Sequence, residues 1–177
     1  MKNLIFTFLL LLLSLNLGAQ TDSDSLYQRK NDIVVDPIML IAIPAVNISY
    51  ERLISKGSGI GVNALVSLQR DDVSNFTQIS PYYRMYFGKK YASGFFLEGF
   101  VPITTTKEDY TYITTSAPRD VKETATTVGI GFGVGGKWVV RKNLLIEVSG
   151  GIARRFTNKE YIEYLTGRFM GGIGYRF

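Results

Sequence analysis

Residues 131–137 (GFGVGGK) have the residue types and spacing of a nucleotide-binding site. They fit the dinucleotide pattern G-x-G-x-x-G and most of a phosphate-binding loop, and both motifs require a strand, a glycine turn and then a helix. Here the glycines alternate with apolar residues inside one extended run. Trp138 stands where Ser or Thr is required, and Val139 and Val140 continue the run. The stretch therefore predicts a strand, and no cofactor is expected.

The chain has no histidine and no cysteine, so the side chains that most often serve as acid–base catalysts and thiolate nucleophiles are absent. Histidine most often moves protons in active sites, and thiolates act as nucleophiles and metal ligands. Two carboxylate pairs, Asp71–Asp72 and Glu108–Asp109, lie in polar stretches without an apolar pocket to raise a carboxyl pKa. We therefore expect no catalytic residues, no metal site and no enzymatic activity. The net charge of +5 is scattered, so nucleic acid is not an expected partner.

Charged residues of both signs recur opposite the apolar positions of alternating segments. They are Asp36, Glu51, Arg84, Glu98, Lys137, Glu147 and Arg168, together with Arg155 and Arg176. Buried charges are tolerated when they are paired and hydrogen-bonded. Counting from the tight turns, we expect Lys137 opposite Glu147 and Arg84 diagonal to Glu98. The interpretation is an ion-pair network that fills the interior, with a proton or ion path as the alternative.

The elements that would position these charges are strands. From Asp32 onward the chain divides into runs of about ten residues, most of which alternate with period two. The runs are 32–40, 45–54, 60–68, 76–87, 93–102, 127–140, 144–155 and 167–177. They predict an all-β fold, an eight-stranded antiparallel up-and-down barrel that spans a membrane.

The face that carries the apolar residues distinguishes a membrane barrel from a soluble, periplasmic, lipocalin-like binding barrel. In residues 127–140 the apolar row, which includes Val128, Phe132 and Trp138, stands opposite a row of glycines. Glycines cannot form the apolar interior that a barrel in water needs. The apolar row is therefore expected to face lipid, and Phe96 and Phe100 are expected to fill the space inside.

Connections alternate between tight and long, as in barrels of the bacterial outer membrane. The tight ones, residues 55–58, 88–92 and 141–142, would face the periplasm, and the long ones, 70–75, 103–124 and 156–163, would lie outside. The short apolar connection at 41–44 should be external and fits least well. Aromatic residues near the tight end predict a membrane girdle, namely Tyr83, Phe87, Trp138, Tyr175 and Phe177. A final strand ending on Phe177 is typical of the signal read by the barrel-assembly machinery.

The N-terminal stretch has the pattern of a secretory signal peptide. A basic start, an apolar run over residues 4–13 and a small-residue site at 17–19 predict cleavage after Ala19. The expected organisation is a signal peptide over 1–19, a flexible polar leader over 20–31 and an outer-membrane β-barrel over 32–177.

Four stretches resemble a known family: 49–52 (SYER), 81–90 (PYYRMYFGKK), 94–100 (GFFLEGF) and 134–138 (VGGKW). With them the chain resembles, over about residues 30–177, the small outer-membrane β-barrel domain proteins of Bacteroidota, whose function is uncharacterised. The resemblance implies an OmpX- or OmpA-like eight-stranded barrel in the outer membrane and no catalytic residues.

The function expected from the sequence is that of a non-enzymatic outer-membrane barrel with a plugged polar lumen. Its role would be structural or a surface interaction, in which loop 103–124 meets an extracellular or membrane protein partner. Membrane lipid and the barrel-assembly machinery are the other expected partners. The alternatives are a narrow pore for a small or apolar solute and the soluble periplasmic barrel.

Overall fold

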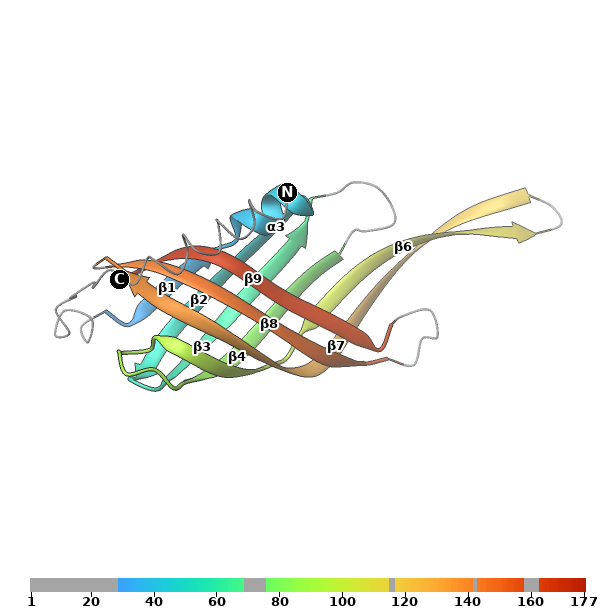
Figure 1. Cartoon of the computed structure of the whole chain (residues 1–177). Coiled ribbons are helices and arrows are strands. Elements are labelled where there is room, and N and C mark those ends of the chain that lie inside the picture. Colours follow the sequence, from blue (N-terminus) through green and yellow to red (C-terminus); the bar gives the residue numbers. More distant parts are fainter. Residues whose placement is uncertain (1–28, 69–75, 115–116, 142, 158–162) are drawn as a thin grey trace, which may run out of the picture.

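The computed structural model describes residues 29–68, 76–114, 117–141, 143–157 and 163–177 (Figure 1). The predicted signal peptide, most of the leader and the Asp71–Asp72 pair lie outside these residues. Of the described helices, none has the length and apolar character needed to cross a bilayer.

The described strands form one antiparallel sheet that closes on itself (Figure 1). They are β1 (Asn31–Val35), β2 (Ala45–Ser55), β3 (Ser58–Ser67), β4 (Phe76–Tyr86), β5 (Gly94–Phe100), β6 (Ile103–Thr114), β7 (Ala117–Val140), β8 (Leu144–Phe156) and β9 (Leu165–Arg176). Strands β5 and β6 occupy one position, because each pairs with β4 on one side and β7 on the other. Pro102, which has no N–H to donate, lies in the break between them. The described strands therefore fill eight positions, and the predicted up-and-down barrel is confirmed.

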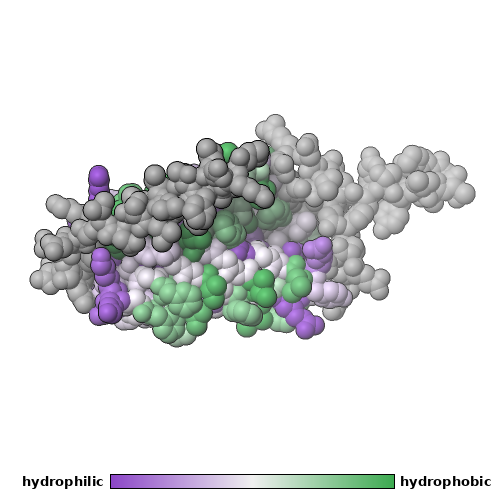
Figure 2. All heavy atoms as spheres, in the orientation of Figure 1, coloured by the Kyte–Doolittle hydropathy of each residue, from purple (hydrophilic) through white to green (hydrophobic). Residues whose placement is uncertain are grey.

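The alternation of the strands sorts polar residues inward and apolar residues outward. Along β2, Ser49 and Glu51 are buried while Ile48 and Tyr50 are exposed, because successive side chains of a strand point to opposite faces. On the face shown in Figure 2, hydrophobic residues gather along the middle of the barrel, with hydrophilic residues at its two ends. The polarity is inverted relative to a soluble barrel.

The glycines of β7 make room for aromatic rings inside the barrel. A Cβ added to Gly135 would lie 2.6 Å from Cζ of Phe96, and one added to Gly131 would lie 2.7 Å from Cζ of Phe100. Both rings are buried, at 0% and 2% exposure. The prediction that Phe96 and Phe100 fill the space opposite the glycines is confirmed.

The segment 103–124, predicted as a loop, is instead a β-hairpin. Strands β6 and β7 pair continuously from Ile103 opposite Val128 to Thr114 opposite Ala117, and Figure 1 shows them projecting beyond the barrel. The reason is local, since the segment is rich in Thr, Tyr and Ile, whose side chains favour extended backbone. The carboxylate pair at 108–109 belongs to this hairpin.

The run 32–40, predicted as one strand, is also corrected. Strand β1 begins at Asn31, inside the predicted leader, and ends at Val35, and helix α3 (Pro37–Ala42) follows. Asp36 caps the helix, since its Oδ1 accepts hydrogen bonds from the backbone N–H groups of Ile38 and Met39, both at 3.0 Å. Proline is suited to the first turn of a helix, where no N–H is needed, so Asp36 and Pro37 start a helix in place of further strand.

Candidate functional site

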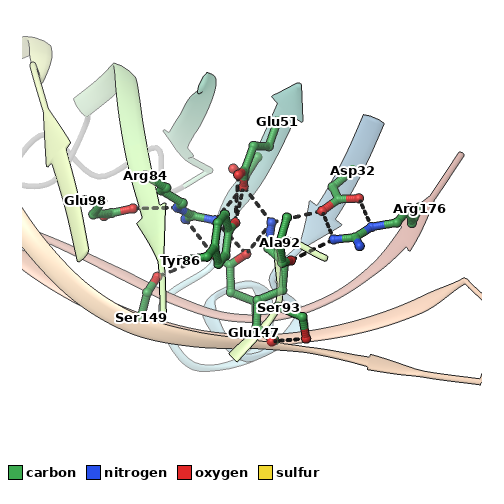
Figure 3. Close-up of polar contacts among 12 residues, drawn as sticks. Asp32, Glu51, Arg84, Tyr86, Ala92, Ser93, Glu98, Glu147, Ser149 and Arg176 are labelled. Atoms are coloured by element: carbon green, nitrogen blue, oxygen red, sulfur yellow. Dashed lines mark hydrogen bonds and ion pairs between the residues drawn. The ribbon is translucent and has the colours of Figure 1, made fainter. Parts of the chain in front are cut away.

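Eight charged side chains meet inside the barrel, in the half nearer its tight turns. Figure 3 labels Asp32, Glu51, Arg84, Glu98, Glu147 and Arg176 among them. We call this group the lumen charge cluster: Asp32, Glu51, Arg84, Glu98, Lys137, Glu147, Arg168 and Arg176. Each is at most 4% exposed, and together they come from seven strands. Four are cationic and four are acidic, so the cluster is neutral overall.

Arg84 on β4 holds the centre of the cluster. Its guanidinium donates to Glu98 at 2.8 Å, to Glu51 at 2.9 Å, and to both carboxylate oxygens of Glu147 at 2.6 and 2.9 Å. The Tyr82 and Phe96 rings lie 4.4 and 4.3 Å from its Cζ. Glu98 stands directly opposite Arg84 in the β4–β5 register, where a diagonal position was expected. The planar group thus combines charge-assisted hydrogen bonds with cation–π contacts.

Lys137 on β7 links three carboxylates. As predicted, it stands opposite Glu147 in register, and its Nζ lies 3.7 Å from that carboxylate. It also donates to Glu51 at 2.5 Å and to Asp32 at 3.1 Å. Glu51 in turn accepts from the hydroxyl of Tyr86 at 2.7 and 2.9 Å. Every carboxylate of the cluster therefore contacts two cations.

Arg176 on β9 ties the cluster to the turn between β4 and β5. It holds Asp32 with two hydrogen bonds, at 2.8 and 2.9 Å, and donates to the backbone carbonyls of Tyr91 and Ala92, both at 2.9 Å. Both turn residues are buried, and the N–H of Ala92 donates to the carbonyl of Lys56 in the β2–β3 turn at 2.8 Å. The stretch 88–92, predicted only as a tight turn, therefore folds against the cluster.

The other half of the interior is lined mainly by neutral polar side chains. Asn63 donates to Oδ1 of Asn47 at 2.7 Å, and Thr104 donates to Oε1 of Gln78 at 3.0 Å. Arg168 connects the two halves, with its guanidinium 4.6 Å from the Tyr82 ring and Nη1 3.4 Å from Glu98. Charge patterning did not single out the neutral residues, although their alternation with outward apolar residues places them inside.

The predicted site residues divide as follows. Glu51, Arg84, Glu98, Lys137, Glu147, Arg168 and Arg176 come together in the cluster, whereas Arg155 is partly exposed and lies outside it. Asp36 does not, because β1 ends before it and its carboxylate caps α3. Asp32 was not predicted as a member of the cluster. It could have been found from the alternation of β1, because Asp32 lies two residues before the inward-facing Val34 and therefore on the same face.

The residues of the predicted girdle all lie on the outer surface. Tyr83, Phe87, Trp138, Tyr175 and Phe177 are each at least 46% exposed. Large aromatic side chains are normally buried in water-soluble proteins, so their common exposure marks the surface at this end of the barrel as unusual.

No protein-family model and no curated protein sequence matches this chain. Among solved structures, the chain is similar to the N-terminal β-barrel domain of Pseudomonas aeruginosa OprF, with 15% sequence identity and a TM-score of 0.46. The similarity covers 84% of this chain and 96% of that domain. So distant a likeness transfers no function, and the closed barrel of eight positions rests on the strand pairing of this chain itself.

Proposed function

We propose that this chain is an integral barrel of the bacterial outer membrane that carries out no chemistry and holds the β6–β7 hairpin on a rigid cylinder. One observation carries the proposal, namely that the polarity of the barrel is inverted. The interior buries the eight charged side chains of the lumen charge cluster, while outward residues such as Ile130, Phe132 and Ile152 are 59–67% exposed. In water this arrangement would expose the apolar rows, whereas in a bilayer the same rows meet acyl chains.

The closed hydrogen-bond ladder gives further support. A sheet inside a bilayer must satisfy its backbone groups without water, and pairing of β3 with β4 and of β1 with β9 closes the sheet, except along the stretch of β2 and β9 beyond the end of β1. The exposed aromatic residues fit the interface of a membrane, where amphipathic rings collect. The exposed lysines in the tight turns, Lys56, Lys89 and Lys90, lie at that same end, where lipid headgroups would stand.

The lumen charge cluster acts in this proposal as a polar core that plugs the barrel. Arg84 and Lys137 are fully buried, and each is bridged to a carboxylate on a strand that is not its neighbour: Arg84 on β4 to Glu147 on β8, and Lys137 on β7 to Asp32 on β1. The cluster therefore cross-links the cylinder. A narrow pore is the alternative function, and it needs a water path past Arg84 and Glu98. Recording in planar bilayers separates the two, because the plugged barrel conducts no ions and a pore gives discrete current steps.

The heat-modifiability of the protein on gels tests the membrane assignment. A folded membrane barrel migrates faster when it is not boiled and stays with the detergent-extracted membrane fraction. Release into the soluble fraction without detergent would overturn the proposal and favour the soluble periplasmic barrel.

The β6–β7 hairpin is the proposed contact surface for a protein partner. Long surface segments on rigid scaffolds commonly carry binding sites. Thr106 and Ala125 are cross-strand partners, so residues 107–124 can be replaced by an Asn-Gly turn that keeps the barrel register. We expect this variant to lose its partners in a cross-linking pull-down while it keeps the gel shift. An unchanged set of partners would refute the assignment. Membrane lipid and, through β9, the barrel-assembly machinery complete the proposed partners.

A further inference from the structure

The barrel wall has a gap where β1 stops early. Strand β1 pairs with β9 only as far as Val35 opposite Ile173, whereas β9 continues back to Leu165 and β2 continues to Ala45. Along this stretch no strand lies between β2 and β9 among the described residues. Backbone groups left unpaired in a bilayer are costly, so the gap needs other hydrogen-bond partners.

Two side chains supply those partners. Oδ2 of Asp36 accepts from the backbone N–H of Gly171 at 2.9 Å and from Nδ2 of Asn47 at 3.1 Å. The same Asn47 nitrogen donates to the backbone carbonyl of Phe169 at 2.9 Å. With the two helix N–H groups on Oδ1, the Asp36 carboxylate accepts four hydrogen bonds and pairs with no described cation. Side chains therefore continue the wall where the backbone ladder ends.

Helix α3 lies on the outside of the barrel over this gap. Phe169 and Ile173 point outward and are exposed, and Gly171 belongs to the same face of β9, yet Gly171 is buried. A Cβ added to Gly171 would lie 2.7 Å from Cδ1 of Ile38, so the helix covers that position. The helix packs against β2 and β9, the two strands that border the gap (Figure 1).

The outer surface of this helix is wholly apolar. Residues 37–46 (PIMLIAIPAV) contain no polar or charged side chain. Ile38, Leu40, Ile41 and Ile43 are 49–84% exposed, and they continue the exposed apolar surface of Ile48 and Ile173 on the adjoining strands. A contiguous apolar surface of this kind is unfavourable in water.

We infer that Asp36, α3 and Asn47 form a wall clasp, in which α3 is embedded in the membrane leaflet on the hairpin side and acyl chains cover its exposed face. This inference rests on the proposed membrane function. It explains why the connection between β1 and β2 is apolar although it lies at the end of the longer connections. In the clasp, a helix on the outside of the barrel closes the part of the wall between β2 and β9 that no strand fills.

Single cysteines test the depth of α3, because the chain has none of its own. We would place one at Ile41→Cys, one at Val134→Cys on the apolar surface of β7 and one at Lys89→Cys in a tight turn, all exposed positions. Each is labelled with bimane and folded into dioleoylphosphatidylcholine vesicles. Doxyl-labelled phosphatidylcholine then quenches from within the lipid, and iodide quenches from water.

The label at position 41 is expected to behave like the one at 134, with strong doxyl quenching and several-fold weaker iodide quenching than at 89. If position 41 matches 89 while 134 is quenched by lipid, the clasp is overturned and the membrane barrel stands. If 134 is also quenched by iodide and not by lipid, the proposed function fails as well.

A second variant tests the contact under the helix. Gly171→Leu would collide with Ile38 and displace α3, whereas an added Cβ at the outward Gly150 meets nothing within 4 Å. In the Ile41→Cys background, Gly171→Leu should raise iodide quenching several-fold and Gly150→Leu should leave it unchanged. Equal quenching in the two variants would overturn the docking of α3 on β9. Should Gly171→Leu fail to fold, the depth measurement at position 41 decides alone.

Discussion

Arg84→Met removes the cation at the centre of the lumen charge cluster while keeping an unbranched side chain between its two rings. Arg84 donates four hydrogen bonds to three carboxylates, those of Glu51, Glu98 and Glu147. Without it, four buried carboxylates face three cations. We expect the variant barrel to be strongly destabilised, because one negative charge is left without a cation in the buried interior.

The magnitude follows from the burial of the whole cluster. Removing one partner of a buried pair costs about 3–5 kcal/mol. At roughly 1.4 kcal/mol for each factor of ten, the unfolding equilibrium constant rises by about two to four powers of ten. With a urea dependence of roughly 1–3 kcal/mol per molar, the unfolding midpoint falls on the order of 2 M.

Urea titration of the barrel in lipid vesicles measures this change. Trp138 is the single tryptophan of the chain and is half exposed on the outer face, so its fluorescence reports transfer between lipid and water. Lys89→Met is the matched control, because Lys89 is an exposed cation in a tight turn. Substitutions of that kind usually change stability by about 0.5 kcal/mol or less.

A double variant separates charge imbalance from lost packing. Adding Glu147→Gln to Arg84→Met removes one of the carboxylates left in excess, so the double variant should lose less stability than the two single variants together. Strict additivity, or an Arg84→Met variant within about 1 kcal/mol of the parent, would refute a stabilising role for the cluster.

Three further predictions concern the packing and hydrogen bonds of the wall. Gly135→Val should prevent the barrel from closing, because the added Cβ would lie 2.5 Å from the Cβ of Ser149. Gly150→Val should fold normally, because a Cβ added there meets nothing within 4 Å. The heat-modifiable gel shift distinguishes the two variants. Tyr86→Phe removes the hydroxyl that bonds a buried carboxylate, so urea titration should show a loss of about 1.5–3 kcal/mol. Asp36→Ala leaves wall and helix N–H groups without an acceptor, and hydrogen exchange at Gly171 should become much faster, whereas unchanged protection would contradict the clasp.

Much of the fold was readable from the sequence because strand alternation is a local property. Period-two patterns place a residue on the inner or outer face without knowledge of any partner. The tight connection after Val140 also sets the register of β7 on β8, so the pairing of Lys137 with Glu147 followed from counting. The signals for the two corrected segments were local as well, namely Asp36 with Pro37 for α3 and the Thr- and Tyr-rich residues for the hairpin.

Long-range contacts could not be read in this way, because they depend on how the sheet closes. Asp32 and Arg176 are 144 residues apart, and Asp36 and Gly171 are 135 apart; both pairs exist because β1 meets β9. The β4–β5 turn folds inward, with Ala92 at a φ of 38°, and beyond it Arg84 pairs directly with Glu98. The sequence by itself determined which face of each strand is polar, and the closure of the barrel decided which polar groups meet, because partners across a barrel are fixed by strand order and register.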